Sequence, residues 1–331
     1  MFGLRKVIFF ILLITAIISG IYFFSKKIEE KNLKTEVEFG VTFSQKKAES
    51  LNLDWRETYL AILKDLKVKK IRLSAYWDEI ERNLGEYNFE SLDWQIERVE
   101  KEGGEIILAI GQKLPGWPEC HLPKWVNGLS KEEREDSLII FLRKVIERYK
   151  EKKVIKVWQV ENEPFLTWFG ICPPFDKDFF KREINLVRSL DNRPIIVSES
   201  GELSTWLPAS RYADILGITM YRVVWNPYFK YFTYPYPAGL YFLKGEIVKF
   251  LSGVKKIICL ELQAEPWSDK PLIEVPFSEQ IRLMNIEKFK KIIEFAKRAG
   301  FPENYFWGVE WWYWLKEKGD DSIWQEVKKL W

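Results

Sequence analysis

Two glutamates that each follow an apolar run could carry acid–base and nucleophilic chemistry. Glu163 lies in the segment WQVENEP at residues 158–164, and Glu261 directly follows the run IICL. Cleavage of a glycosidic bond requires two carboxyl groups that face each other across a cleft. One protonates the leaving oxygen, and the other attacks the anomeric carbon or activates water. Glu265 offers another carboxylate nearby, but Glu261 is the better candidate because it comes directly after the apolar run.

The remaining reactive side chains exclude several other kinds of site. The 331 residues contain a single histidine, His121, which excludes a multi-histidine metal site and argues against a Ser-His-Asp triad. The three cysteines lack metal-type spacing, so we expect no metal and no organic cofactor. Cys120 and Cys172 lie in Pro-rich loops, and the sequence is equally consistent with a disulfide between them and with two free thiols. The net charge of +3, with the two signs interspersed, argues against a nucleic-acid partner.

Short apolar runs alternate with amphipathic helical stretches along residues 37–331. This alternation indicates a parallel sheet with helices outside, and eight strands close a (β/α)8 TIM barrel. An open doubly wound sheet is the alternative, but it normally has a glycine-rich loop after its first strand, and residues 42–46 (TFSQK) contain none. We predict one catalytic domain over 37–331, with strands at 38–43, 70–75, 105–110, 155–160, 194–199, 215–219, 256–261 and 305–309. The predicted helices cover 55–66, 92–101, 131–150, 177–189, 245–252, 279–299 and 321–330.

The carboxyl ends of the predicted strands collect polar residues, and in a TIM barrel the active site lies at that end. Arg72 lies near the end of the second strand, and Tyr221 follows the sixth. The fourth strand leads to Asn162 and Glu163, and the seventh ends at Glu261. Strands four and seven lie on opposite sides of a closed ring, so the two candidate carboxylates should face each other.

The segment WQVENEP resembles the fourth-strand Asn-Glu-Pro signature of the clan A retaining glycoside hydrolases, the cellulase-like superfamily of TIM barrels. The resemblance covers residues 38–315 and implies that Glu163 is the acid/base and Glu261 the nucleophile. It implies that Asn162 binds the 2-hydroxyl of the sugar at the cleavage point. By the same resemblance, the residues that position the nucleophile and floor the reactive subsite are Arg72, Tyr221 and Trp311.

The resemblance therefore implies retaining hydrolysis of β-linked glycans or glycosides by double displacement. The expected partner is an oligo- or polysaccharide substrate. A catalytically silent cell-surface carbohydrate-binding barrel and a transglycosylase are the alternatives. A transglycosylase would use every residue named above, so product analysis must distinguish it from a hydrolase.

Aromatic residues make up 16% of the chain, and many of the sixteen tryptophans lie beside Pro or Gly in predicted loops. Exposed rings in a cleft suit the flat C–H faces of sugars. Trp117 and Trp125, in the third loop, either bind substrate as a wall of the cleft or pack the loop onto the barrel. The aromatic loop at 223–243 is expected to form a subsite wall, with a membrane-interface contact as the alternative.

Residues 7–24 (VIFFILLITAIISGIYFF) form an uncharged run just long enough to cross a bilayer as a helix. We predict a transmembrane signal anchor over 1–25 and a polar tether over 26–36. A cleaved signal peptide is the alternative, although no A-x-A-like site precedes Lys26. The chain is therefore expected in the cell membrane as a single-pass protein with an extracytoplasmic catalytic domain, the membrane being a partner through the N-terminal helix.

Overall fold

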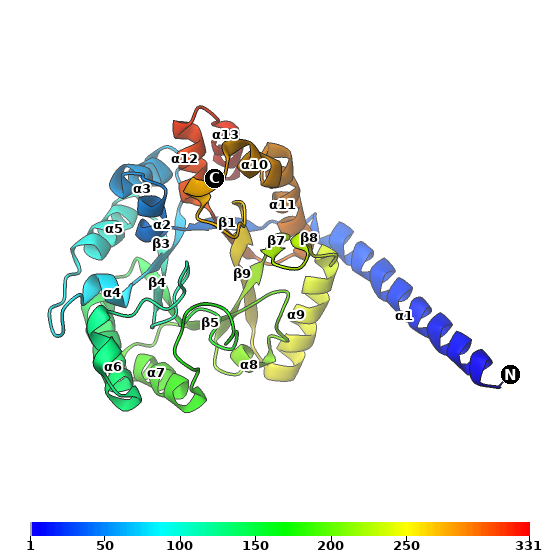
Figure 1. Ribbon diagram of the computed structural model, residues 1–331, viewed down its shortest axis with the longest axis horizontal. Helices are drawn as coiled ribbons and strands as arrows, with labels where there is room; N and C mark the ends of the chain where they lie inside the picture. Colours follow the sequence, from blue (N-terminus) through cyan, green and yellow to red (C-terminus); the bar gives the residue numbers. More distant parts are fainter. Residues whose placement is uncertain (1) are drawn as a thin grey trace.

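A computed structural model describes residues 2–331 and contains a closed barrel of parallel strands (Figure 1). Around the ring the strand order is β1-β10-β9-β6-β5-β4-β3-β2. The predicted TIM barrel is confirmed, and each predicted barrel strand matches an observed one to within two residues at either end. The barrel strands are β1 (Glu38–Thr42), β2 (Lys70–Ser74), β3 (Glu105–Ile110), β4 (Ile155–Val160), β5 (Ile195–Glu199), β6 (Ile215–Met220), β9 (Lys256–Gln263) and β10 (Glu303–Trp307).

Helices cover the outside of this ring, as Figure 1 shows. The longer ones are α3 (Trp55–Lys64), α5 (Glu90–Lys101), α6 (Lys131–Tyr149), α7 (Lys177–Leu190), α9 (Ala238–Ser252), α11 (Ile286–Ala299) and α12 (Val309–Glu317). The N-terminal helix α1 (Phe2–Asn32) instead projects away from the ring. The shorter ones are α2 (Gln45–Ser50), α4 (Trp77–Ile80), α8 (Leu207–Ser210), α10 (Phe277–Leu283) and α13 (Ser322–Val327).

Side-chain alternation along the strands divides the core into two layers. On β3, Ile106 and Leu108 join the large apolar cluster that packs against the helices, whereas Ile107 belongs to a separate cluster with residues of β5, β9 and β10. That second cluster fills the barrel interior, because successive strand residues point to opposite faces. Gly40 leaves room for it, since a Cβ there would lie 2.7 Å from the ring of Tyr305.

A β-bulge interrupts this alternation on β9. Ile218 of β6 pairs with Cys259, but the next residue, Thr219, pairs with Glu261, so β9 carries one extra residue. The pairing of β9 with β10 shifts at the same place. A bulge of this kind re-aims the side chains that follow it. Consequently Leu260 joins the interior cluster, and Glu261, its immediate neighbour, also lies on the interior side.

The structure departs from the predicted elements at two places near the carboxyl end of the barrel. The aromatic loop at 223–243 contains an antiparallel hairpin, β7 (Val223–Asn226) and β8 (Lys230–Thr233), and then the first turns of α9. The last barrel strand ends at Trp307 and not at residue 309, because Gly308 adopts a φ of 123° and α12 begins directly after it.

The N-terminal helix ends in contact with the barrel. Residues 26–32, predicted as part of a polar tether, continue α1, and this end packs against α9 and α11. Glu29 is 1% exposed, accepts a hydrogen bond from the Gly239 backbone N–H at 3.1 Å and lies 3.7 Å from Arg298. The helix fits closely, since a Cβ on Gly239 would lie 2.3 Å from the Ser25 carbonyl oxygen.

The predicted transmembrane anchor at residues 7–24 lies within α1, where several side chains fall outside the described residues. Among the residues that are described, no helix combines the length and apolar composition that a membrane crossing requires. The predicted membrane span, and with it the membrane as a partner through this helix, is therefore not supported. The apolar run does not end at a flexible tether but continues into the charged helical turns that pack on α9.

Replacement of Glu29 should weaken the attachment of α1. Glu29→Ala leaves the Gly239 N–H without its buried acceptor, so we expect a loss of about 1–3 kcal/mol in the free energy of unfolding. Glu30→Ala, at the neighbouring exposed position, is the matched control and should change it by less than about 0.5 kcal/mol. Denaturant titration of the two variants is the measurement, and equal effects would contradict the buried contact.

Candidate active site

A buried arginine joins the strands on both sides of the barrel mouth. Arg72 is 0% exposed and faces the interior, since its neighbours on β2 point outward into the helical layer. Its Nη1 donates to Glu261 Oε1 at 2.6 Å, and its Nη2 donates to Asn162 Oδ1 at 2.9 Å. Its Nε donates to Gln159 Oε1 at 2.7 Å. One guanidinium thus fixes the positions of side chains from β4 and β9.

Glu261 receives a hydrogen bond on each carboxylate oxygen. Arg72 binds Oε1, and the Tyr221 hydroxyl donates to Oε2 at 3.0 Å. Burial, followed by the charge of Glu261, holds the pKa of Tyr221 well above its ordinary value, so this hydroxyl keeps its proton and remains a donor. Both contacts stabilise negative charge on Glu261, which is 6% exposed. Arg72 and Tyr221 thus both contact Glu261 directly.

Glu163 occupies the loop after β4 in a conformation that non-glycine residues rarely adopt. Its φ is 45°, and it is 7% exposed. The backbone is held at both ends of the residue: its N–H donates to Ser198 Oγ at 2.9 Å, and its carbonyl accepts from Lys113 Nζ at 3.0 Å. Strained backbone of this kind persists where surrounding contacts fix it, and it is concentrated at functional sites.

The register of the barrel brings Glu163 and Glu261 together. Glu163 Oε1 accepts from the Thr219 hydroxyl at 3.4 Å, and Thr219 is the β6 partner of Glu261. Burial raises the pKa of Glu163 well above its ordinary value, and the nearby charge of Glu261 raises it further. Of the two carboxyl groups, Glu163 therefore favours its protonated form, whereas Glu261 accepts a hydrogen bond on each of its oxygens.

Asn162 lies between these groups with its amide orientation fixed by its neighbours. Its Oδ1 accepts from Arg72 at 2.9 Å and from Ser198 Oγ at 3.1 Å. Its Nδ2 therefore points the other way and donates to Glu119 Oε2 at 3.3 Å. The predicted neighbourhood of Asn162 with Glu163 and Arg72 is observed.

Glu119 is a third carboxyl group in this site, and the sequence pattern did not single it out. It is 6% exposed, and its φ is 74°. Burial, followed by the charge of Glu261, raises its pKa to about 8. The signal that could have found it is its position beside Cys120: a disulfide from Cys120 to the loop after β4 would bring Glu119 to the barrel mouth.

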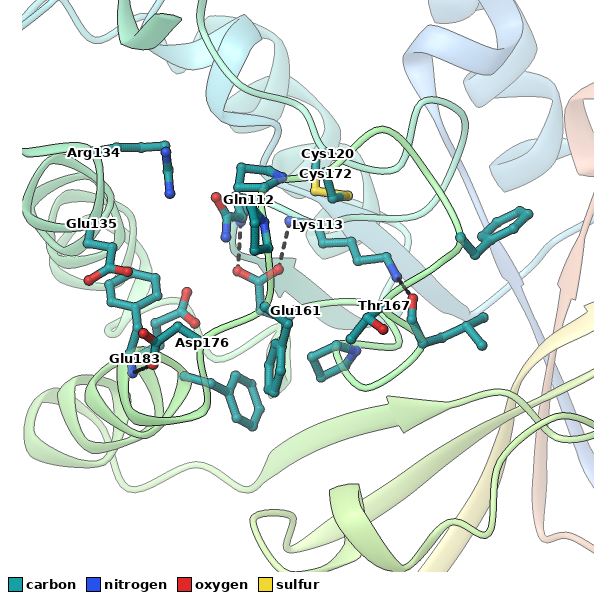
Figure 2. Close-up of a pocket in the computed structure, with 18 residues that line it drawn as sticks. Gln112, Lys113, Cys120, Arg134, Glu135, Glu161, Thr167, Cys172, Asp176 and Glu183 are labelled. Atoms are coloured by element: carbon teal, nitrogen blue, oxygen red, sulfur yellow. Dashed lines mark hydrogen bonds between the residues drawn. A yellow bond between two sulfur atoms is a disulfide. The ribbon is translucent and has the colours of Figure 1, made fainter. Parts of the chain in front are cut away.

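That disulfide is present in the structure, where Cys120 and Cys172 join the loops after β3 and β4. The two cysteines are among the residues that line a small cavity of about 40 Å³. Figure 2 shows the side chains around this cavity. Glu161 points into this cavity region and accepts from the backbone N–H groups of Gln112 and Lys113 at 2.8 and 2.6 Å. Glu161 therefore secures the loop after β3 through two backbone amides.

Lys113 also secures the loop that carries Glu163. Its buried ammonium group donates to the carbonyl oxygens of Glu163 and Leu166 at 3.0 and 2.9 Å. A buried cation bound to two carbonyl dipoles fixes the path of the loop without neutralising either candidate carboxylate directly. Nothing in the spacing of the sequence indicated this role.

The prediction that Trp311 forms the floor of the reactive subsite is wrong. Trp311 is 0% exposed in α12 and donates its indole N–H to Gln280 at 2.7 Å, so it belongs to the core. The physical reason is the early end of β10 at Gly308, which turns the following residues into a helix. Trp307 takes the place at the strand end. It is 9% exposed and donates to Glu265 Oε1 at 3.0 Å.

The two third-loop tryptophans have different environments. Trp125 is half-buried, packs edge-on against Trp77 and donates its indole N–H to the Glu81 carbonyl at 2.9 Å, which matches the loop-packing interpretation. Trp117 is 68% exposed and contacts Phe169. Phe169 in turn contacts Trp267, whose ring lies 4.9 Å from that of Tyr221. A row of aromatic rings thus leads from the Glu261 side of the site to the exposed Trp117.

Glu265, the alternative nucleophile, is engaged elsewhere. Its Oε1 accepts from both Trp307 Nε1 and Lys47 Nζ, the latter at 2.8 Å. His121 is 2% exposed, contacts the Tyr76 ring and lies 3.1 Å from the Gly116 carbonyl, and burial lowers its pKa to about 3. It is a neutral structural imidazole. Among the residues that the structure describes, no group of three or more His, Cys, Asp or Glu side chains is arranged to hold a metal ion.

Comparison with known proteins supports the fold at low sequence identity. No family model and no curated protein matches the sequence. Among solved structures, the GH5_18 protein of Bifidobacterium longum subsp. longum ATCC 55813 superposes with a TM-score of 0.58 at 12% identity, covering 82% of this chain and 70% of that one. The endo-β-1,4-xylanase of family GH10 from Gloeophyllum trabeum gives 0.55 at 15% identity and covers 83% and 85%.

The β-galactosidase of Halorubrum lacusprofundi gives a TM-score of 0.56 at 15% identity and covers 82% of this chain. The chain spans about half the length of that enzyme, namely 52% of it, and 50% of the β-galactosidase of Bacillus circulans sp. alkalophilus. At these identities the likeness shows a shared barrel, which is the fold that the resemblance to clan A glycoside hydrolases implies.

Arg72 should be the most sensitive position of the site for stability. Arg72→Met leaves the buried Glu261 carboxylate without its counter-ion and removes the donors to Asn162 and Gln159, so we expect a loss of about 3–5 kcal/mol in the free energy of unfolding. Arg82→Met breaks an exposed pair with Glu79 and should cost no more than about 1 kcal/mol. Denaturant titration compares the two, and similar losses would contradict the role of Arg72 as the central ion pair.

Proposed function

We propose that the protein is a retaining glycoside hydrolase that cleaves β-linked glycans or glycosides by double displacement. The observation that carries this proposal is the pairing of Glu163 with Glu261. They adjoin at the mouth of one barrel, where burial raises the pKa of Glu163 and where Glu261 accepts hydrogen bonds from Arg72 and Tyr221. Two carboxyl groups with separate acid and nucleophile roles are the chemical requirement of the reaction. The chain also shares its fold with proteins titled β-galactosidase and endo-β-1,4-xylanase.

The first half of the proposed reaction forms a glycosyl-enzyme. Glu163 donates its proton to the glycosidic oxygen while Glu261 attacks the anomeric carbon, and the aglycone leaves as an alcohol. Arg72 and Tyr221 hold the Glu261 carboxylate in place from two sides. The positive charge that develops on the sugar ring is stabilised by the same carboxylate until the bond forms.

The second half uses the same residues in reverse. The departed aglycone leaves room for water, and Glu163, now ionised, accepts a proton from that water as it attacks the anomeric carbon. The bond to Glu261 breaks, and the product keeps its original configuration. The contacts from Ser198 and Lys113 to the Glu163 backbone keep its carboxyl group in reach of both the aglycone oxygen and the water.

We further propose that the barrel works outside the cytoplasm. The supporting observation is the Cys120–Cys172 disulfide, which joins the two loops that bear Glu119 and Glu163. Such bonds persist in oxidising compartments and are rare in a reducing cytosol. Alkylation of the native chain purified from its host, followed by mass spectrometry, should find these two cysteines unmodified.

The role of Glu163 as the acid predicts a particular pH dependence. Its raised pKa means that it keeps its proton to a higher pH than an ordinary glutamic acid, so kcat/KM should fall only as the pH rises through that raised value. Glu163→Gln should remove this basic limb. It should lower hydrolysis of glycosides with poor leaving groups by about 10²–10⁴-fold and should affect aryl glycosides with good leaving groups much less. An unchanged basic limb in the variant would exclude Glu163 as the acid.

The role of Glu261 as the nucleophile predicts a covalent adduct. A fluorinated mechanism-based glycoside should leave one sugar attached to Glu261, visible by mass spectrometry of the digested protein. Glu261→Ala should abolish the adduct and lower hydrolysis by several orders of magnitude, whereas Glu265→Ala should keep both. Reversible binding without an adduct would indicate the silent carbohydrate-binding barrel, and transfer of the sugar to an added glycan in preference to water would indicate a transglycosylase.

A further inference from the structure

Glu119 is the carboxyl group of the site that the double-displacement chemistry leaves without a role. It lies in the same site as Glu261 and Glu163: the charge of Glu261 adds to the burial that raises the pKa of Glu119, and the charges of Glu261 and Glu119 add to the burial that raises the pKa of Glu163. Both reacting groups must flank the anomeric carbon of the sugar. A third group that adjoins both of them is therefore near that carbon and the substituents next to it.

The hydrogen bonds around Asn162 show what Glu119 faces. Asn162 Oδ1 is taken by Arg72 and Ser198, so only the two hydrogens on Nδ2 are left for other partners. One of them is directed to Glu119 Oε2 at 3.3 Å. Among the described residues nothing donates to the other carboxyl oxygen of Glu119, although the side chain is 6% exposed. The amide and the carboxyl group thus form one side of the subsite, with a hydrogen-bonding position free on each.

The loop that carries Glu119 is built to hold this side chain in place. Its N–H donates to the Gly116 carbonyl at 2.8 Å, and its carbonyl accepts from the Leu114 N–H at 2.8 Å. The next residue is bonded to Cys172, and Gly170 passes so close that a Cβ there would lie 2.6 Å from Glu119 Cβ. A side chain fixed this firmly in a buried position is pre-organised for a partner at a defined distance.

We propose that Glu119 determines specificity at the carbon next to the anomeric carbon, where together with Asn162 it binds a free 2-hydroxyl group of the sugar. The inference rests on the proposed glycosidase function, and its new element is Glu119, which adds to the contact with the 2-hydroxyl that the resemblance implies for Asn162. A 2-deoxy sugar leaves both hydrogen-bonding positions empty, which costs affinity in a buried site.

The protonation of Glu119 favours a neutral hydroxyl over a 2-ammonium group. Its pKa of about 8 keeps the carboxyl group largely protonated at pH 7, so it donates to and accepts from a hydroxyl. A protonated carboxyl group gives a cation no charge to pair with. A sugar with a 2-hydroxyl satisfies this arrangement without any change in the charge of the site.

The test compares aryl β-glycosides that differ only at carbon 2, namely the 2-hydroxy, 2-deoxy, 2-acetamido and 2-amino forms of a sugar that the enzyme cleaves. In the wild type, kcat/KM should be highest for the 2-hydroxy form. In Glu119→Ala the ratio of 2-hydroxy to 2-deoxy kcat/KM should fall about tenfold. Glu119→Gln, which still donates and accepts, should retain most of the ratio, and the exposed control Glu132→Ala should leave it unchanged.

Two results would overturn the inference: the same ratio in Glu119→Ala as in the wild type, or a preference of the wild type for the 2-amino form. If Glu119→Ala does not fold, Glu119→Asn replaces it, because Asn tolerates the positive φ at this position and withdraws the carboxyl group. Labelling of Glu261 by the fluorinated glycoside separates the two proposals. Labelling with an unchanged ratio removes the specificity role alone, whereas no labelling and no turnover removes both.

Discussion

The site depends on one buried guanidinium group. Arg72 binds Glu261, Asn162 and Gln159 through three different nitrogens, and it has no exposed surface. A planar group with fixed donor directions can hold three partners only if the strands that bear them keep their register. The closed barrel supplies that register, and Arg72 in turn compensates the charge that β9 brings into the interior. The geometry of the candidate active site and the stability of the barrel mouth are therefore coupled through one side chain.

Around this centre, the loops that carry the carboxyl groups adopt costly backbone conformations. Glu119, Glu161 and Glu163 all have φ between 45° and 74°, a region that side chains other than Gly, Asn and Asp rarely occupy. Lys113 and the Cys120–Cys172 disulfide offset this cost by fixing the paths of the two loops. The backbone strain at these three residues is thus offset by contacts that hold the acidic groups in a defined arrangement.

The fold could be predicted from the sequence because the strands are short β-branched runs separated by helical periodicity. Glu163, Glu261 and Arg72 could be found because they lie at strand ends. The bulge on β9 could not be predicted, since it becomes visible only in the pairing with β6, and strict alternation would send Glu261 outward. Trp311 was misplaced because the sequence pattern does not show that the strand ends before Gly308 and that the run VEWWYW after it forms a helix. Glu119 escaped notice because its place depends on a loop path and a disulfide.

The end of α1 that packs on the barrel fixes the orientation of this helix relative to the barrel. Because Glu29 and Ser25 are buried against α9, the helix is fixed to the barrel and is not joined to it by a flexible tether (Figure 1). A partner that binds the N-terminal turns of this helix would therefore also fix the direction that the mouth of the barrel faces. The mouth of the barrel would then keep one direction relative to whatever holds the helix.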